Sequence, residues 1–385
     1  MKSFKKKLFL FIMLLNTLTL SSCWNYREID DLAIVAGVAV DKEKSTGKYI
    51  LTIEIMNPVE GQGMNSKLVK TKGDSVFDSY RQILKTSGKK AYWSHSKILV
   101  LSKEISKSDL ITIMDLVNRD REMRGDMKIL VSKEDTASKI LYKAHEPGAD
   151  VTSFNIEESL KNQKHVSHYS SMNIWEFTEA LLAEGYSPLL PSIEIEVQEK
   201  VPFYKISGSV AFKGDKQVNG LNDTETKWAL IVMDKLEGGS IIVESKVDDE
   251  TYKNTLEIFK NKTKVKPEYK NDKLTMNINV ELDVGIIELN RQKDFIEEKG
   301  RIILQEDAEN YIKRKVEKVI EKCQKDIESD IFDFSGIIMR EMPKEWKYKI
   351  QPNWEYHFKK LDTRVEVKIN IRNSGLISKP IEVGE

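Results

Sequence analysis

The sequence predicts an α+β protein built from more than one domain, and three observations support that fold class. Between Leu274 and Val284 every second residue is apolar and the others are polar, which is typical of a strand with one buried face. From about Gln305 to Asp330 an apolar stripe lies opposite a side rich in Glu and Lys, which predicts an amphipathic helix. The first half of the chain alternates shorter helix and strand patterns. A chain of 385 residues is also longer than one hydrophobic core usually serves.

The first 22 residues have the order of a secretory signal peptide. A lysine-rich start from Lys2 to Lys7 precedes a mostly apolar run, Leu8 to Leu20, and small residues follow at Ser21 and Ser22. The apolar run would form a helix of about 20 Å, which is short of the roughly 30 Å hydrocarbon core of a bilayer. Residues 1–22 are therefore predicted to be a lipoprotein signal peptide, and the folded body is predicted to lie outside the cytoplasm.

The four residues Leu20-Ser21-Ser22-Cys23 resemble a bacterial lipobox. In such a motif the small side chains admit a dedicated peptidase, and the cysteine thiol accepts a diacylglycerol as a thioether. Cys23 would then become the first mature residue and carry an N-acyl chain as well. Two or three acyl chains, at about 0.8 kcal/mol per buried methylene, give lasting attachment to a membrane. The alternative is an ordinary cleaved signal peptide followed by an incidental cysteine.

Composition excludes several classes of protein. The 61 basic and 61 acidic residues are well mixed, so no basic stripe indicates nucleic-acid binding. After residue 22 no apolar run approaches the length of a membrane span, so we do not expect a multi-span channel or transporter.

With Cys23 lipidated, Cys323 has no partner for a disulfide. Cys323 lies on the apolar face of the long predicted helix, which favours a buried structural thiol over a reactive one.

The N-terminal region, residues 23–200, begins with a predicted hairpin. Leu32 to Val40 and Tyr49 to Met56 read as its strands, and residues 59–73 are polar and glycine-containing, which predicts a loop. The remaining predicted helices run from Asp74 or Ser75 to Gly88, from Ser106 or Ser108 through Val117, from Thr136 to Lys143, from Phe154 to Leu160, and from Ser170 or Ser171 through Ala183; the remaining strands are Lys97 to Leu101, Met127 to Val131, and Ile193 to Val197, which could also be a linker.

A domain boundary is expected near residues 198–203, after the breaks at Pro188 and Pro191. Residues 201–385 then form a C-terminal α/β domain. Its predicted elements are a strand at Ile206 to Phe212, a helix from Asn222 or Thr224 to Leu236, a strand at Leu274 to Val284, the long helix at about 305–330, and a strand at Val365 to Ile371. A long helix with one apolar stripe needs a sheet to bury it, so we expect these strands to pack on that helix.

No catalytic motif or cofactor motif is complete in this sequence. Gly61-Gln62-Gly63 follows a strand, but Ser66 stands where the dinucleotide fingerprint needs its third glycine. A phosphate-binding loop, a His-Glu-x-x-His motif and a Gly-x-Ser-x-Gly motif are all missing from the sequence. We therefore predict no catalytic residue, no cofactor and no metal ligand.

The remaining candidates have simpler structural interpretations. His165 and His168 could share a metal, but no third ligand lies near in sequence, so a polar loop is favoured. His95 starts a strand, where a structural hydrogen bond is favoured over a catalytic base. The mixed-charge segment 119–124 is interpreted as a salt-bridged turn. The aromatic residues that could stack on a ligand but are interpreted as core are Trp346, Trp354, Tyr356 and Phe358.

Several segments resemble the spore germination lipoprotein family, the C subunits of nutrient germinant receptors. The opening block is the most specific, and the matching segments are Cys23-Trp24, Arg27 to Val35, the segment around His95, Pro188-Leu189-Leu190-Pro191, Gly208 to Lys213, Pro343-Lys344-Glu345-Trp346, Trp354, Phe358 and Gly375-Leu376. The resemblance spans nearly the whole chain after the signal peptide. Each later motif is loose by itself, but chance does not readily produce their order and spacing.

This resemblance implies a non-enzymatic lipoprotein at the outer face of the spore inner membrane. It implies that the protein works beside the integral membrane A and B subunits, which sense nutrients and conduct ions. It also implies three mixed α/β domains, two of them within residues 23–200. Two other functions stay open from the residues. A solute-binding lipoprotein would deliver a nutrient to a transporter, although no internal repeat indicates two similar lobes. A lipid-tethered hydrolase would need a nucleophile and a base, which the sequence does not identify.

Overall fold

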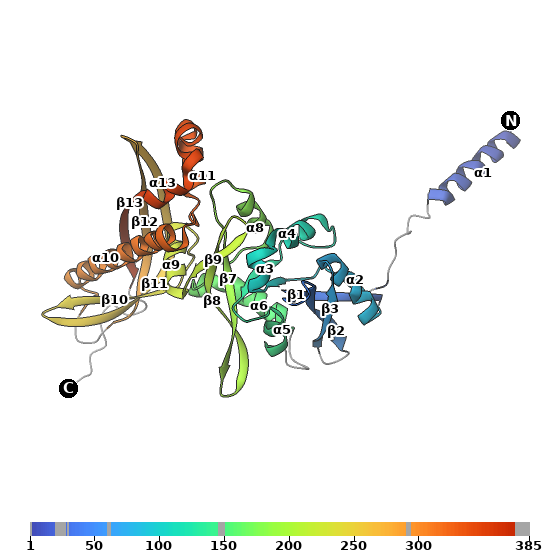
Figure 1. The fold of residues 1–385 in the computed structure, drawn as a ribbon, viewed down its shortest axis with the longest axis horizontal. Helices are drawn as coiled ribbons and strands as arrows, with labels where there is room; N and C mark the ends of the chain where they lie inside the picture. The colour runs from blue at the N-terminus through green and yellow to red at the C-terminus, as the bar shows by residue number, and fades with distance from the viewer. Residues whose placement is uncertain are drawn as a thin grey trace.

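The computed structural model describes residues 2–19, 28, 31–59, 63–144, 151–289 and 294–373. Helix α1 (Lys2–Thr19) is drawn apart from a body made of two sheets and their helices (Figure 1). Among the described residues, no helix combines the length and apolar character needed to cross a membrane. The mixed α/β fold class with several structural units is confirmed.

The first sheet runs in the order β3-β2-β1-β5-β6-β7-β8-β9, and β4 pairs with the start of β1. Its middle is parallel (β1-β5-β6-β7), whereas antiparallel strands close both ends. The strands are β1 (Leu32–Lys42), β2 (Tyr49–Val59), β3 (Gly63–Gly73), β4 (Lys90–Tyr92), β5 (Ile98–Leu101), β6 (Lys128–Ser132), β7 (Leu189–Gln198), β8 (Val201–Lys213) and β9 (Lys216–Leu221).

Helices cover both faces of this sheet, which explains why its central strands are continuously apolar. In β5, Leu99 and Leu101 enter one core while Ile98 and Val100 enter the other. The first core is covered by α2 (Val76–Ser87), α3 (Lys103–Ser108), α4 (Leu110–Arg119) and α8 (Ile174–Leu182), and the second by α5 (Ser138–Ala144) and α6 (Thr152–Lys161), which α7 (Gln163–Val166) follows.

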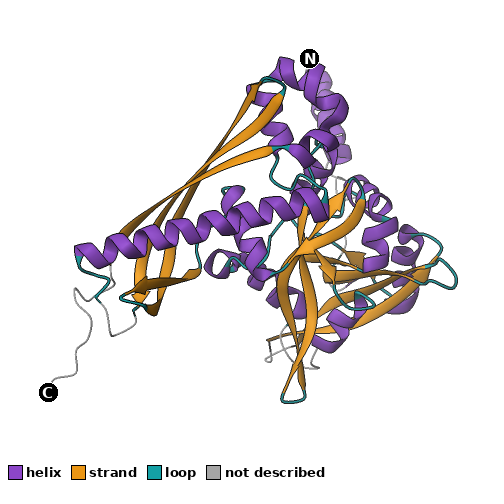
Figure 2. Ribbon diagram, turned by 60° about the vertical axis from the view of Figure 1, so that its left-hand side comes forward, coloured by secondary structure: helices purple, strands orange, loops and turns teal. Residues whose placement is uncertain are grey.

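The second sheet has the order β10-β11-β12-β13 and packs on the long helix α10, as expected (Figure 2). Its strands are β10 (Ser240–Val247), β11 (Glu250–Lys270), β12 (Lys273–Glu288) and β13 (Asp362–Asn373), and its helices are α9 (Asp223–Val232), α10 (Glu298–Lys322), α11 (Phe334–Glu341), α12 (Pro343–Glu345) and α13 (Trp354–Lys360). Ile312 and Val316 of α10 and Ile278 and Leu282 of β12 are buried in one shared core. The parallel pairing of β12 with β13 is possible because the α10–α13 segment crosses over between them.

The prediction of a loop over residues 59–73 is wrong for residues 63–73, which form β3. Val69 and Thr71 are buried, whereas Lys70 and Lys72 are exposed. This strand lies at the edge of the sheet, where lysines protect the free backbone groups. Strands are usually recognised by aliphatic residues at every second position. In β3 threonine and lysine occupy several of these positions, so the strand was not predicted.

Three helix ends also differ from the prediction. The helix predicted from Ser106 or Ser108 through Val117 is α4, which begins at Leu110 with Asp109 at its N-cap position, and the shorter α3 before it is capped by Ser102. Asn173 caps α8 in a reciprocal capping box with Glu176, instead of Ser170 or Ser171. Helix α9 ends at Val232, instead of Leu236. The predicted caps Ser75 and Asn222 are confirmed. The long helix begins at Glu298 and passes at Cys323 into a π-helical turn that ends at Ile327.

The first sheet continues past residues 198–203, where a domain boundary is expected. Glu199 and Lys200 form the turn between β7 and β8, which pair in the same sheet. That sheet continues to Leu221, and it contributes Leu189 and Ala211 to the core of the second sheet. The strand pairing therefore passes from the first sheet to the second after Leu221, and one sheet runs through the described part of residues 32–221. The domain boundaries, including the two subdomains that the resemblance implies within residues 23–200, stay predictions.

Candidate functional site

Cys23, the predicted lipidation site, lies outside the described residues, as do the neighbouring residues of the family motif. The described body begins at Asp31, and β1 starts at Leu32. Leu32 pairs with Lys90 of β4, just after helix α2 ends. The structure therefore fixes where the segment from Cys23 enters the fold.

Cys323 is a free, buried thiol at the first residue of the π-helical turn that follows α10. Its burial, together with the nearby carboxylate of Asp330, raises the pKa of the thiol. Such a thiol is a poor nucleophile because the thiolate is the reactive form. The interpretation as a structural cysteine is confirmed.

The predicted histidines do not form a site. His165 lies at the end of the short helix α7, and His168 follows it; both are exposed. Desolvation and the nearby Lys227 lower the pKa of the His168 imidazole. His95 is exposed, with its ring 5.8 Å from the ring of Tyr92. Within the part of the chain that the structure describes, no three His, Cys, Asp or Glu residues are grouped as metal ligands would be.

The C-terminal aromatic residues are core, with one exception. The rings of Trp346 and Trp354 are 5.4 Å apart and those of Trp354 and Phe358 are 5.8 Å apart, and all three residues are buried. Tyr356 is 57% exposed and interacts instead with the ammonium group of Lys360, 4.5 Å from its ring centre.

The turn at residues 119–124 is salt-bridged, as predicted. Arg119 pairs with Asp115 at 2.8 Å, Arg124 pairs with Asp126, and Glu122 pairs with Lys90. Gly61 and Gln62 of the rejected glycine motif lie outside the described residues, and Gly63 opens strand β3.

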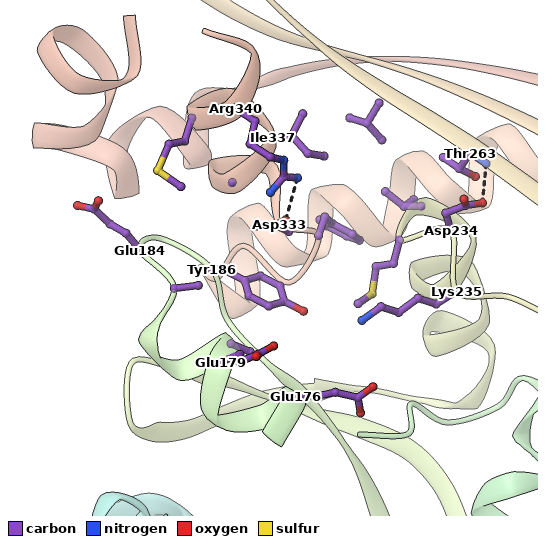
Figure 3. A pocket seen from close by; sticks show the side chains of 18 of the residues that line it. Glu176, Glu179, Glu184, Tyr186, Asp234, Lys235, Thr263, Asp333, Ile337 and Arg340 are labelled. Carbon is purple, nitrogen blue, oxygen red and sulfur yellow. Dashed lines mark hydrogen bonds and ion pairs between the residues drawn. The ribbon is translucent and has the colours of Figure 1, made fainter. Parts of the chain in front are cut away.

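The main candidate site is a cleft of about 550 Å³ between the first sheet's helices and the second sheet. One wall comes from α8 and the segment that follows it, through Tyr186. The opposite wall comes from α11, from β11 and from the segment after α9 (Figure 3). Clefts between structural units are common ligand sites, so the side chains that line this cleft are the main candidates for binding a ligand.

Polar groups from both walls face this cleft. The side chains of Tyr186 and Lys235 point into it from opposite sides (Figure 3). Burial, followed by the negative charges of Asp333 and Asp330, raises the pKa of the Tyr186 phenol. That phenol is therefore protonated at neutral pH and is available as a hydrogen-bond donor. Arg340 pairs with Asp333 at 3.2 Å, so its guanidinium is partly neutralised.

The carboxylates around the cleft are mostly engaged in structure. Asp234 accepts hydrogen bonds from the backbone N–H of Thr263 at 2.7 Å and from the amide of Asn261. Glu176 accepts from the backbone N–H of Asn173 as part of the α8 capping box. Glu184 accepts from the side-chain amide of Gln351 at 2.6 Å. The cleft therefore offers a binding surface for a small polar molecule rather than a set of free bases.

The segment that forms one wall of the cleft is held by the C-terminal part of the chain. The indole N–H of Trp354 donates to the carbonyl of Gly185 at 3.0 Å. The backbone N–H of Ser187 donates to the carbonyl of Asp330 at 2.8 Å. Gly185 has φ +76°, and a Cβ there would lie 2.6 Å from the Trp354 ring, so only glycine fits. These contacts fix the two walls relative to each other.

This cleft is not visible in the sequence. Its walls come from residues 172–186, 232–235, 263–265 and 332–340, which are far apart along the chain. The Asp333–Arg340 pair lies within one helix and its cap, but nothing in its sequence pattern separates it from an ordinary surface ion pair. The sequence carries no signal of this juxtaposition.

Comparisons with known proteins agree over almost the whole chain. A family model described as "Spore germination protein N-terminal domain" matches residues 25–195, and one described as "Spore germination B3/ GerAC like, C-terminal" matches residues 207–375. Spore germination protein KC of Bacillus subtilis (strain 168) is 23% identical over 409 residues, covering 98% of this chain and 98% of that protein. Spore germination protein B3 of the same organism is 23% identical over 396 residues, covering 98% and 100%.

A solved structure, "Crystal Structure of the GerBC protein", has the same fold. It superposes with a TM-score of 0.56 and 20% sequence identity, covering 88% of this chain and 97% of that chain. The family resemblance stated from the residues is thereby confirmed. This chain belongs to the B3/GerAC family of spore germination proteins.

Proposed function

We propose that the protein is a membrane-anchored lipoprotein subunit of a spore nutrient germinant receptor. In this proposal Cys23 carries the lipid, and the body lies at the outer face of the spore inner membrane. The protein acts without catalysis, by assembling with or coupling to the integral membrane A and B subunits.

The observation that carries this proposal is the match to spore germination proteins along nearly the full length of both chains. A match of this extent covers the opening segment as well as both sheets, so it is not a shared module on an unrelated protein. The cleft adds no nucleophile paired with a base, and most of its carboxylates, including Glu176, Asp234 and Glu184, are engaged in structural hydrogen bonds. Contact with partner proteins is therefore the simplest mode of action.

Replacing the proposed lipidation site tests the anchor and the role together. In spores carrying Cys23→Ala, we expect the protein to be lost from the membrane fraction and nutrient-triggered germination to fail. Germination by a non-nutrient trigger is expected to stay normal, because that route bypasses the receptor. Membrane retention, incorporation of a labelled fatty acid, and germination are the three measurements.

Cys323→Ala is the matched control, because it removes the only other cysteine, which is buried. It is expected to keep the fatty-acid label and the membrane retention. If the Cys23→Ala protein instead stays membrane-bound with its nutrient response intact, the anchored-subunit proposal is wrong.

The cleft favours a second candidate function, binding of a nutrient by this subunit itself. Tyr186 and Lys235 face each other across a space large enough for a small polar molecule. On this candidate, one nutrient from a panel of amino acids and sugars raises the melting temperature of the purified protein, because ligands stabilise the state that binds them. Tyr186→Phe and Lys235→Met are expected to abolish that rise, while Lys246→Met, on β10, keeps it. A panel without any stabilising compound contradicts the candidate.

A further inference from the structure

Helix α2 has an exposed side that combines large apolar residues with cations. Phe77 is 42% exposed and Leu84 is 57% exposed, one near each end of the helix. Arg81 lies between them, with its guanidinium carbon 4.9 Å from the centre of the Phe77 ring. Lys85 and Lys89 are exposed at the C-terminal end. We call these five residues the α2 face.

The α2 face is not needed to hold the fold. The opposite side of α2 buries Val76, Tyr80 and Ile83 against the first sheet. Ser75 caps the start of the helix, and Gly88, with φ +70°, closes its end. Exposed pairs of large apolar residues on a helix that is already anchored in this way indicate a surface that meets something else.

The position of the α2 face relative to the N-terminal segment indicates what it meets. Strand β4 begins at Lys90, two residues after the helix cap, and Lys90 pairs with Leu32 at the start of β1. Leu32 lies nine positions after Cys23, so even a fully extended segment between them spans only about 30 Å. The whole of α2 is about 18 Å long at 1.5 Å per residue. A lipid on Cys23 would therefore keep the α2 face within reach of the bilayer surface.

The charges of the α2 face suit an anionic surface. Among the residues that the structure describes, no carboxylate forms an ion pair with Arg81, Lys85 or Lys89. A hollow of about 500 Å³ lies beside Phe77 and Leu84, and its acidic lining residues are Asp120 and Glu122. Glu122 is paired with Lys90, and the remaining carboxylates on this side are Asp120 and Asp78, which lies on α2 and feels the charge of Lys85. The three cations of the α2 face therefore outnumber these two carboxylates by one. Apolar residues flanked by cations are typical of helices that lie in the interface of anionic membranes.

We propose that the α2 face, Phe77, Arg81, Leu84, Lys85 and Lys89, docks on the surface of a bilayer that contains anionic lipid. Phe77 and Leu84 enter the headgroup region, and the cations bind lipid phosphates. This inference rests on the proposed lipid at Cys23, and it adds a defined orientation: the body lies against the membrane through α2 instead of swinging on its tether. A fixed orientation would present the same surfaces to partner proteins in every copy.

A fluorophore placed on α2 tests this orientation in the full-length lipidated protein. Leu84→Cys is labelled with an environment-sensitive dye and reconstituted on vesicles of phosphatidylcholine and phosphatidylglycerol that carry a lipid-borne quencher. We expect blue-shifted emission and strong quenching at position 84. The matched control is Leu182→Cys, which is 82% exposed at the end of α8; its dye is expected to emit as in water and to stay unquenched.

The cation component is tested with the same labelled protein. Vesicles of phosphatidylcholine alone, or the additional changes Arg81→Gln, Lys85→Gln and Lys89→Gln, are expected to reduce the quenching because phosphate contacts are lost. Each of these residues is exposed, so folding is expected to be unaffected.

The outcomes separate this inference from the proposed anchor. Protein that fails to float with vesicles, or a wild-type chain that takes up dye at Cys23, contradicts the anchor. Protein that floats while position 84 stays unquenched overturns the docking of α2 and leaves the anchor in place. In that case the α2 face would contact a protein partner instead.

Discussion

Glu54→Ala is expected to lower the free energy of unfolding by about 4 kcal/mol, because it leaves several buried donors without an acceptor. The Glu54 carboxylate is fully buried in β2 and accepts from the backbone N–H groups of Thr152 and Ser153, at 2.9 and 2.8 Å. It also accepts from the hydroxyls of Ser153 and Ser66, at 2.5 and 2.6 Å. Glu54 thus caps helix α6 from a strand that is about 100 residues away in the chain.

Gly37 makes this capping possible. A Cβ at Gly37 in β1 would lie 2.2 Å from the hydroxyl oxygen of Ser153, so the helix end could not approach the sheet. Thermal unfolding of the full chain in detergent measures the effect of Glu54→Ala. The control is Glu196→Ala, a half-exposed partner of Lys205, which is expected to cost less than about 1 kcal/mol. Equal melting temperatures for the two variants would contradict the capping role.

Asp330→Ala is expected to destabilise the junction between the two sheets by about 3 to 5 kcal/mol, since three buried N–H groups lose their acceptor. The Asp330 carboxylate accepts from the backbone N–H groups of Phe332, Phe334 and Ser335, at 3.1, 3.2 and 2.8 Å. These bonds form the start of α11, which lines the cleft. The control is Asp326→Ala, four positions before Asp330. Asp326 is exposed, so this change is expected to leave the free energy of unfolding nearly unchanged.

The same carboxylate gives a pH dependence with a defined sign. Burial raises the pKa of Asp330 from 3.8 to about 7 in the folded state, against the opposing effect of its three N–H donors. Between these two values the folded protein holds a proton that the unfolded chain releases, so this group's contribution to stability falls as pH rises toward 7. Urea unfolding at several pH values should show wild type losing its advantage over Asp330→Ala as pH rises. Parallel profiles for the two proteins would show that Asp330 does not titrate in this range.

The helices, strands and caps that the sequence predicts correctly are those whose physical signal is local and periodic. The alternation in β12, the apolar stripe of α10 and the caps at Ser75 and Asn222 each depend on neighbours within a few residues, so they are visible in one segment. Strands β10 and β11 were not predicted, because the exposed Ile242 and Phe259 stand next to buried apolar residues, so apolar and polar residues do not alternate in the sequence although burial does alternate. The candidate lipidation site also came from a contiguous motif.

By itself, the sequence determined the fold class, most of the helices and strands, the family and the proposed anchor at Cys23. Only the tertiary structure decided which strands form the sheet edges, that one sheet continues past residue 200, and that four distant segments meet at the cleft. It also decided that Glu54 caps α6 and that the start of β1 pairs with β4, two residues after the end cap of α2. The reason is that local periodicity fixes which face of an element is apolar, whereas the partner of that face depends on contacts between residues far apart in the chain.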